Sequence, residues 1–185
     1  MIYNAHGTLK SRIGGKSEII ADAKILALFT ILGLFILAMT PIHEWCHVVA
    51  IRIVGGDAIV QYGGSFIPFG GTTIPFDPRD LDRWVYFAGG FGVFLGCMLL
   101  WFWSQKSRAI YISLPAMIIG LSQLAYAFVE AFIYIPLYHM YHIYHNPVFY
   151  YLFYYLYLVT YAIGTLGGLA IERKRLKAWF RAKEF

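Results

Sequence analysis

The chain has 185 residues, of which 59% are hydrophobic and 14% are charged, and its formal net charge is +5. Charged residues make up about 25% of an ordinary soluble domain, so the composition excludes that class and predicts an integral membrane protein. The positive charge is concentrated at the two ends and in one short loop. The sequence lacks the aromatic and basic pattern of RNA-binding proteins, so a nucleic-acid partner is excluded. The positive charge is instead a guide to membrane orientation.

The first predicted segment is polar, covers residues 1–23 and contains Lys10, Arg12 and Lys16. A long polar stretch before the first apolar run, with no small-residue cleavage site after that run, is not typical of a signal peptide. We expect this segment to lie at the membrane surface or to be partly disordered.

The first membrane span is predicted over residues 24–54. A helix of that length extends about 46 Å, whereas the hydrocarbon core of a bilayer is about 30 Å thick. We therefore expect this helix to be tilted, to protrude or to be kinked, with Pro41 as the expected position of a kink.

This span contains the sequence His43-Glu44-Trp45-Cys46-His47, an H-E-x-x-H motif. Residues four apart share a face of a helix, so the two imidazoles are placed as two ligands of one tetrahedral zinc. Glu44 lies about 100° around the helix from His43, where its carboxylate can take a proton from a metal-bound water. The alternative is a helix whose polar residues face a partner by coincidence. We predict that His43 and His47 bind zinc and that Glu44 is the catalytic base.

Residues 55–82 differ from the preceding apolar span in composition: glycine pairs separate short runs of β-branched and aromatic residues. Such a pattern predicts a small hairpin or sheet. The region is too apolar for an open loop, so we expect it to lie against the membrane beside the first span. Two roles stay open for it, a structural re-entrant connection or an edge strand that pairs with an extended substrate.

Three further spans are predicted over residues 83–104, 109–134 and 147–169, before a basic tail over 171–185. The predicted fold is thus an all-α membrane protein of about four transmembrane helices, with one membrane domain over 24–170 and a small Gly-rich β insertion. Four spans place the N-terminus, the loop with Lys106 and Arg108, and the basic tail on one side. The lysine and arginine bias predicts that both termini are cytoplasmic.

Glu130 lies about as far along the third span as the two histidines lie along the first, and these spans run in the same direction. We therefore expect its carboxylate to be the third zinc ligand, with water or substrate completing the tetrahedron. The alternative is a protonated acid buried in the bundle or hydrogen-bonded to a tyrosine. Gln123, seven residues earlier, lies on nearly the same helix face.

Histidines recur at three-residue intervals after the third span: His139, His142 and His145. They fit an interfacial segment or the surroundings of the metal, and the spacing also permits direct ligation of this metal or a second one. Asp57 is another alternative ligand on the same side.

The H-E-x-x-H motif, the Gly-rich connection after it and two later segments resemble the site-2 protease family of intramembrane zinc metalloproteases. Ala88-Gly89-Gly90 is similar to the A-G-P segment of that family, and residues 122–131 are similar to its N-x-x-P-x-x-x-x-D-G pattern. In the latter, Ser122 replaces Asn, Ala125 replaces Pro, Glu130 replaces the ligand Asp and Ala131 replaces Gly. The resemblance covers residues 24–135.

The resemblance implies one Zn²⁺ per chain and hydrolysis of peptide bonds in a transmembrane protein or peptide substrate. It also implies that Gln123 or Ser122 contacts the substrate or its oxyanion, and that Glu130 completes the ligand set. Two other classes stay open: a membrane di-iron oxygenase or desaturase with histidine boxes, and a non-catalytic metal-binding membrane protein. The sequence indicates neither a particular substrate nor an oligomeric state.

Overall fold

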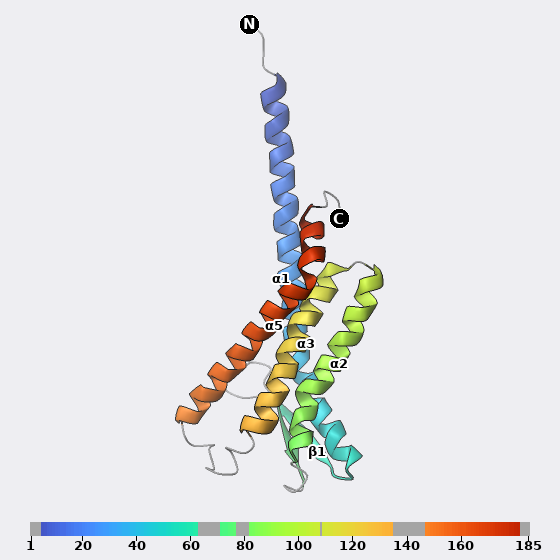
Figure 1. The fold of residues 1–185 in the computed structure, drawn as a ribbon, viewed down its shortest axis with the longest axis vertical. Helices are drawn as coiled ribbons and strands as arrows, with labels where there is room; N and C mark the ends of the chain where they lie inside the picture. Colours follow the sequence, from blue (N-terminus) through green and yellow to red (C-terminus); the bar gives the residue numbers. More distant parts are fainter. Residues whose placement is uncertain (1–4, 63–70, 77–81, 108, 135–146, 182–185) are drawn as a thin grey trace.

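The computed structural model describes residues 5–62, 71–76, 82–107, 109–134 and 147–181. These residues form α1 (Ala5–Ile53), β1 (Ala58–Tyr62), β2 (Gly71–Pro75), α2 (Arg83–Ser107), α3 (Ile110–Val129), the π-helical turn η2 (Glu130–Tyr134) and α5 (Pro147–Arg181). Four of the described helices are long and apolar enough to cross a membrane, and β1 and β2 form an antiparallel pair (Figure 1). The predicted helical fold with a small β insertion is confirmed.

The helix α1 is 49 residues long, and its apolar part runs from Asp22 to Ile53. The predicted polar segment 1–23 therefore belongs to the same helix from Ala5 onward, and these first turns project beyond the rest of the bundle (Figure 1). A helix satisfies its backbone hydrogen bonds internally, so it can pass from a polar to an apolar stretch without ending. It also continues through Pro41.

The central helix is α3, which is the most buried of the four apolar helices and packs against α1, α2 and α5. A Cβ atom at Gly90 of α2 would lie 2.9 Å from the Ala127 side chain, so the glycine lets the α2 backbone lie directly against α3. Buried residues join α1, α2 and α3 in one core: Met39, Val93, Cys97, Ala116 and Ile119. This packing fixes α1 and α3 relative to each other about one helical turn before the motif histidines.

The β-hairpin is held against the C-terminal end of α1. The helix ends in a turn where Gly55 has a φ of 89°, a region that favours glycine, and Gly56 N–H donates to the Ile51 carbonyl at 3.0 Å. β1 then pairs with β2 in a register that sets Ala58 opposite Pro75. A buried cluster joins the hairpin to α1 and to the start of α2: Val48, Ile51, Ala58 and Val85. The hairpin is thus placed beside the last turns of α1, which follow the H-E-x-x-H motif.

Polar side chains join the helices at the opposite end of the bundle. The buried carboxylate of Glu172 accepts hydrogen bonds from the Trp101 indole at 2.6 Å and from Arg175 at 3.1 Å. Lys24, also buried, donates to the Trp179 carbonyl at 3.1 Å. The start of the apolar part of α1 and the last turns of α5 therefore lie at the same end, where α2 also ends (Figure 1).

Candidate metal centre

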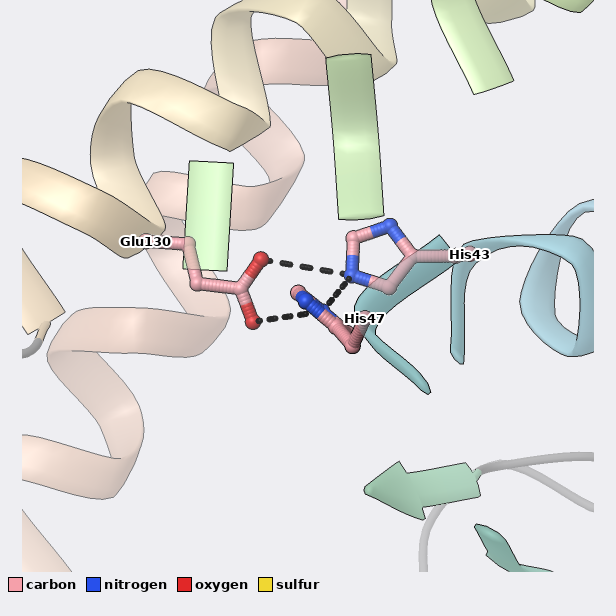
Figure 2. A group of neighbouring side chains, drawn as sticks. All are labelled: His43, His47 and Glu130. Atoms are coloured by element: carbon pink, nitrogen blue, oxygen red, sulfur yellow. Dashed lines mark hydrogen bonds and ion pairs between the residues drawn. The ribbon is translucent and has the colours of Figure 1, made fainter. Parts of the chain in front are cut away.

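Three donor groups converge between α1 and the end of α3. Nε2 of His43 lies 3.2 Å from Oε2 of Glu130, and Nε2 of His47 lies 3.7 Å from Oε1 of the same carboxylate. The two Nε2 atoms are 3.0 Å apart. Figure 2 shows the carboxylate and both imidazoles directed at one point, as the sequence predicts for His43, His47 and Glu130.

Each imidazole is oriented by a hydrogen bond on its other nitrogen. Nδ1 of His47 lies 2.7 Å from the Val85 carbonyl, and Nδ1 of His43 lies 2.9 Å from Oε1 of Gln123. These oxygens can only accept, so both Nδ1 atoms carry the hydrogen and, in the neutral rings, both Nε2 atoms present lone pairs. Ligating histidines in most metal sites likewise donate their other ring N–H to an oxygen.

The spacing of the donors fits a small divalent cation. Two ligands about 2.0–2.1 Å from a tetrahedral zinc lie about 3.3 Å apart, and the three separations here are 3.0, 3.2 and 3.7 Å. Oε2 of Glu130 is buried and accepts no hydrogen bond from the described part of the chain. A largely buried carboxylate whose two oxygens each face a nitrogen lone pair is unfavourable unless a positive charge lies between them. Two histidines and one glutamate are also a donor set of catalytic zinc sites, with a fourth position open.

The backbone of α3 changes at Glu130, where the helix widens into the π-helical turn η2. π-helical turns are rare and often occur at functional sites. The sequence predicts that Glu130 lies at the depth of the histidines, and the structure places it there. It does not predict the π-helical turn, because no local signal distinguishes it from a continued α-helix.

Gly89 of α2 forms the wall of the site next to both rings. A Cβ atom at this position would overlap the His47 ring and would lie 2.7 Å from Nε2 of His43. Glycine is therefore required for the two imidazoles to occupy their positions. The Ala88-Gly89-Gly90 segment is thus part of the site as well as of helix packing.

Glu44 is also buried, but it is not one of the three converging donors. Its Oε2 accepts a hydrogen bond of 2.8 Å from the Thr73 hydroxyl, which also lies 3.1 Å from the Glu44 backbone carbonyl. Thr73 belongs to β2, 29 residues away in the chain. Sequence reasoning missed Thr73, since nothing in a residue of a short strand indicates which helix it will contact.

The two predicted substrate contacts differ in position. Gln123 is buried, and its amide oxygen accepts a hydrogen bond from His43, one of the three residues of the metal group (His43, His47 and Glu130). The Ser122 hydroxyl donates to the Ile118 carbonyl of its own helix at 2.7 Å. It lies on the side of α3 that faces α5, where a Cβ atom at Gly164 would overlap it.

A second missed residue is Tyr126, whose ring centroid lies 5.7 Å from that of His43. It lies one turn before Glu130 on α3, so the four-residue spacing is the signal that identifies it. Tyr126 packs in turn against Tyr157 of α5, with ring centroids 5.2 Å apart. A wall of aromatic side chains thus extends from the metal group to α5.

A cavity of about 280 Å³ lies on the other side of this wall, between α1 and α5. Ile36 and Thr40 line it from α1, and Tyr157 and Tyr161 line it from α5. Ile36, Thr40 and His43 are spaced to share one face of α1. The cavity therefore continues the same helix face that carries the metal group.

Of the remaining predicted ligands that the structure describes, Asp57 is not part of this group. Asp57 is exposed, and it accepts hydrogen bonds from the Ala58 amide at 2.9 Å and from Arg52 at 3.2 Å. These two bonds hold the pKa of the Asp57 carboxyl below its usual range. The later histidines lie outside the described residues: His139, His142 and His145.

Comparison with known proteins assigns the chain to no family. No family model, no curated protein and no solved structure matches it. What this centre does is therefore inferred from its own residues.

Proposed function

We propose that this protein is an intramembrane zinc metalloprotease that hydrolyses peptide bonds of membrane-spanning substrates, as the resemblance to site-2 proteases implies. One observation carries the proposal. His43 and His47 have their Nδ1 atoms bound to carbonyl oxygens, and their Nε2 atoms face the carboxylate of Glu130 inside a bundle of four apolar helices. We propose that these three residues hold one Zn²⁺ per chain.

The chemistry divides between the ion and Glu44. When bound, zinc lowers the pKa of a water molecule and polarises the scissile carbonyl. Glu44 accepts one proton from the attacking water as the water oxygen bonds to the carbonyl carbon. It returns that proton to the amide nitrogen as the C–N bond breaks, so one water is consumed per bond and the carboxylate is regenerated.

The substrate must present an extended segment to this site, because the carbonyl groups of an intact transmembrane helix are hydrogen-bonded within that helix. The β-hairpin beside Glu44 offers strand edges with which such a segment can pair. The cavity between α1 and α5 lies on the face of α1 that carries His43, and it is lined almost entirely by apolar groups. We propose that it receives an apolar side chain near the cleaved bond.

We also propose that the chain spans the membrane with both termini on the cytoplasmic side. Exposed basic residues continue α5 beyond its apolar part: Arg173, Lys174, Lys177 and Arg181. Lys106 lies in the last turn of α2, and α2 ends at the same end of the bundle (Figure 1). An excess of lysine and arginine marks the cytoplasmic side, which leaves the metal centre nearer the outer face. Labelling of single cysteines at Lys106 and at the exposed Asp57, in a background without the native cysteines, tests this in sealed cells, since only the cysteine at position 57 should react from outside.

The decisive experiment compares wild type with Glu44→Gln, both purified and reconstituted in lipid nanodiscs with a set of labelled transmembrane peptides. Glu44 is not among the donors, so the variant should retain about one zinc per chain by mass spectrometry of metals. It should lose cleavage by a factor of about 10²–10⁴, the usual contribution of a general base. Undiminished cleavage by Glu44→Gln would refute the mechanism.

The same metal measurement separates the other classes. Two irons per chain would identify a di-iron enzyme. Bound zinc with no open coordination position and no cleavage of any membrane peptide would favour a non-catalytic metal-binding protein.

A further inference from the structure

We infer that Thr73 of β2 is a positioning residue for Glu44, so that the β-hairpin is part of the catalytic centre and not only a connection between α1 and α2. The inference rests on the proposed function and adds to it a residue that lies outside every motif. Its hydroxyl is 2.8 Å from Oε2 of Glu44 and 3.1 Å from the carbonyl oxygen of the same residue.

The contact is a polar one between two elements, β2 and α1, that are distant in the chain. A threonine hydroxyl in a strand usually bonds locally or to water, whereas this one reaches across to a helix residue beside the metal group. A hydrogen bond to a carboxylate is about twice as strong as one between neutral groups. Within the low-dielectric surroundings of a buried Glu44, this bond restricts which way the carboxylate points.

The hairpin carries Thr73, so any shift of the hairpin would change its bond to Glu44. Packing against α1 holds the hairpin in place. Val60 of β1 pairs with Thr73, and β1 begins at Ala58, which is buried against Val48 and Ile51 of α1. A segment that pairs with the hairpin thus acts on the strand that holds the base. The hairpin and Glu44 are accordingly one coupled unit.

The first test needs no catalytic activity. Hydrogen exchange of the β1 and β2 amides is measured in nanodiscs for wild type, Thr73→Val, Glu44→Ala and the double variant. Thr73→Val removes both contacts with Glu44 and should raise the exchange rates of the strand amides about 10-fold, whereas Glu44→Ala keeps the backbone acceptor and should raise them less. The double variant should match Thr73→Val. Thr160→Val is the matched control, because Thr160 is a buried threonine whose hydroxyl donates to Tyr157 of its own helix. Additive effects, or unchanged exchange in Thr73→Val, would overturn the inference.

The second test separates positioning from a merely structural role. In Thr73→Val, kcat for a cleaved transmembrane peptide should fall about 10- to 100-fold while KM and zinc content stay near wild type. Thr73→Ser, which keeps the hydroxyl, should restore kcat to within about 3-fold of wild type. Unchanged kcat in Thr73→Val overturns the inference and leaves the protease proposal standing. If wild type cleaves nothing, the protease proposal fails, and the exchange measurements alone decide whether Thr73 and Glu44 are coupled.

Discussion

Nε2 of His47 lies 3.0 Å from Nε2 of His43, although the Nδ1 atom of each ring is already bound to an oxygen elsewhere. Two imidazole lone pairs at this distance repel each other, and burial of both rings strengthens that repulsion because the effective dielectric constant is low. Glu130 faces both rings and adds a carboxylate to the same space. The arrangement is favourable only with a cation or a shared proton among the three groups. Removal of one donor should therefore be seen first as loss of metal.

Replacement of Glu130 tests the third ligand directly. Glu130→Ala should weaken zinc binding by more than about 100-fold, because even groups that only orient a ligand contribute about 10- to 100-fold. Metal content after dialysis against a graded chelator measures this. Asp57→Ala is the control and should keep full occupancy, since Asp57 is exposed and bound to Arg52. Full occupancy in Glu130→Ala would transfer the third position to a residue outside this group.

Gln123 should act on zinc through His43. Gln123→Leu keeps the volume of the side chain but removes the oxygen that fixes Nδ1 of His43, so zinc affinity should fall about 10- to 100-fold. Competition with a fluorescent zinc chelator gives the dissociation constant. Ser122→Ala is the neighbouring control, and it should bind zinc like wild type because its hydroxyl bonds to Ile118. Equal affinities for Gln123→Leu and wild type would show that His43 is held by packing alone.

Gly89 should tolerate no side chain. Gly89→Ala forces a methyl group into the His47 ring, and overpacking of this kind costs about 1–3 kcal/mol, even though alanine favours a helix over glycine by about 0.5–1 kcal/mol. Gly96→Ala, on the same helix, meets nothing within 4 Å and should be neutral or slightly stabilising. Thermal unfolding and zinc content measured together distinguish the two. Normal zinc binding by Gly89→Ala would mean that the rings lie elsewhere when metal is bound.

Much of this centre was predictable because its first two donors are local. His43 and His47 are one turn apart in a single helix, so periodicity alone aligns them. Glu130 required one further step, the equal depth of two spans that run in the same direction. That step needs only the rise per residue of a helix and the number of spans.

Other features were not predictable, because they depend on contacts between elements distant in the chain. Thr73 reaches Glu44 only once the register of β1 and β2 is set, and a strand of five residues carries no signal for its contact with a helix. The extent of α1 was also missed, since the polar character of residues 1–23 indicates where apolar burial begins and not where a helix begins. The different surroundings of Gln123 and Ser122 were not predictable either, because they depend on which helices pack against each face of α3.

If the proposed function holds, the cavity between α1 and α5 should set which substrates are cleaved. An apolar cavity of 150 Å³ is large enough for benzene, so the space of about 280 Å³ between α1 and α5 accommodates an aromatic or large aliphatic side chain. Thr40→Trp fills it from α1, and the ratio of kcat/KM for peptides with Phe against Ala beside the cleavage site should fall about 10-fold or more. Leu34→Trp places the same indole at an exposed position of α1 outside the cavity and should leave the ratio unchanged. Zinc content should stay at the wild-type level in both variants, since neither residue is one of the three donors. An equal loss for all peptides in Thr40→Trp would indicate general distortion of α1, and an unchanged ratio would indicate that the side chain binds elsewhere.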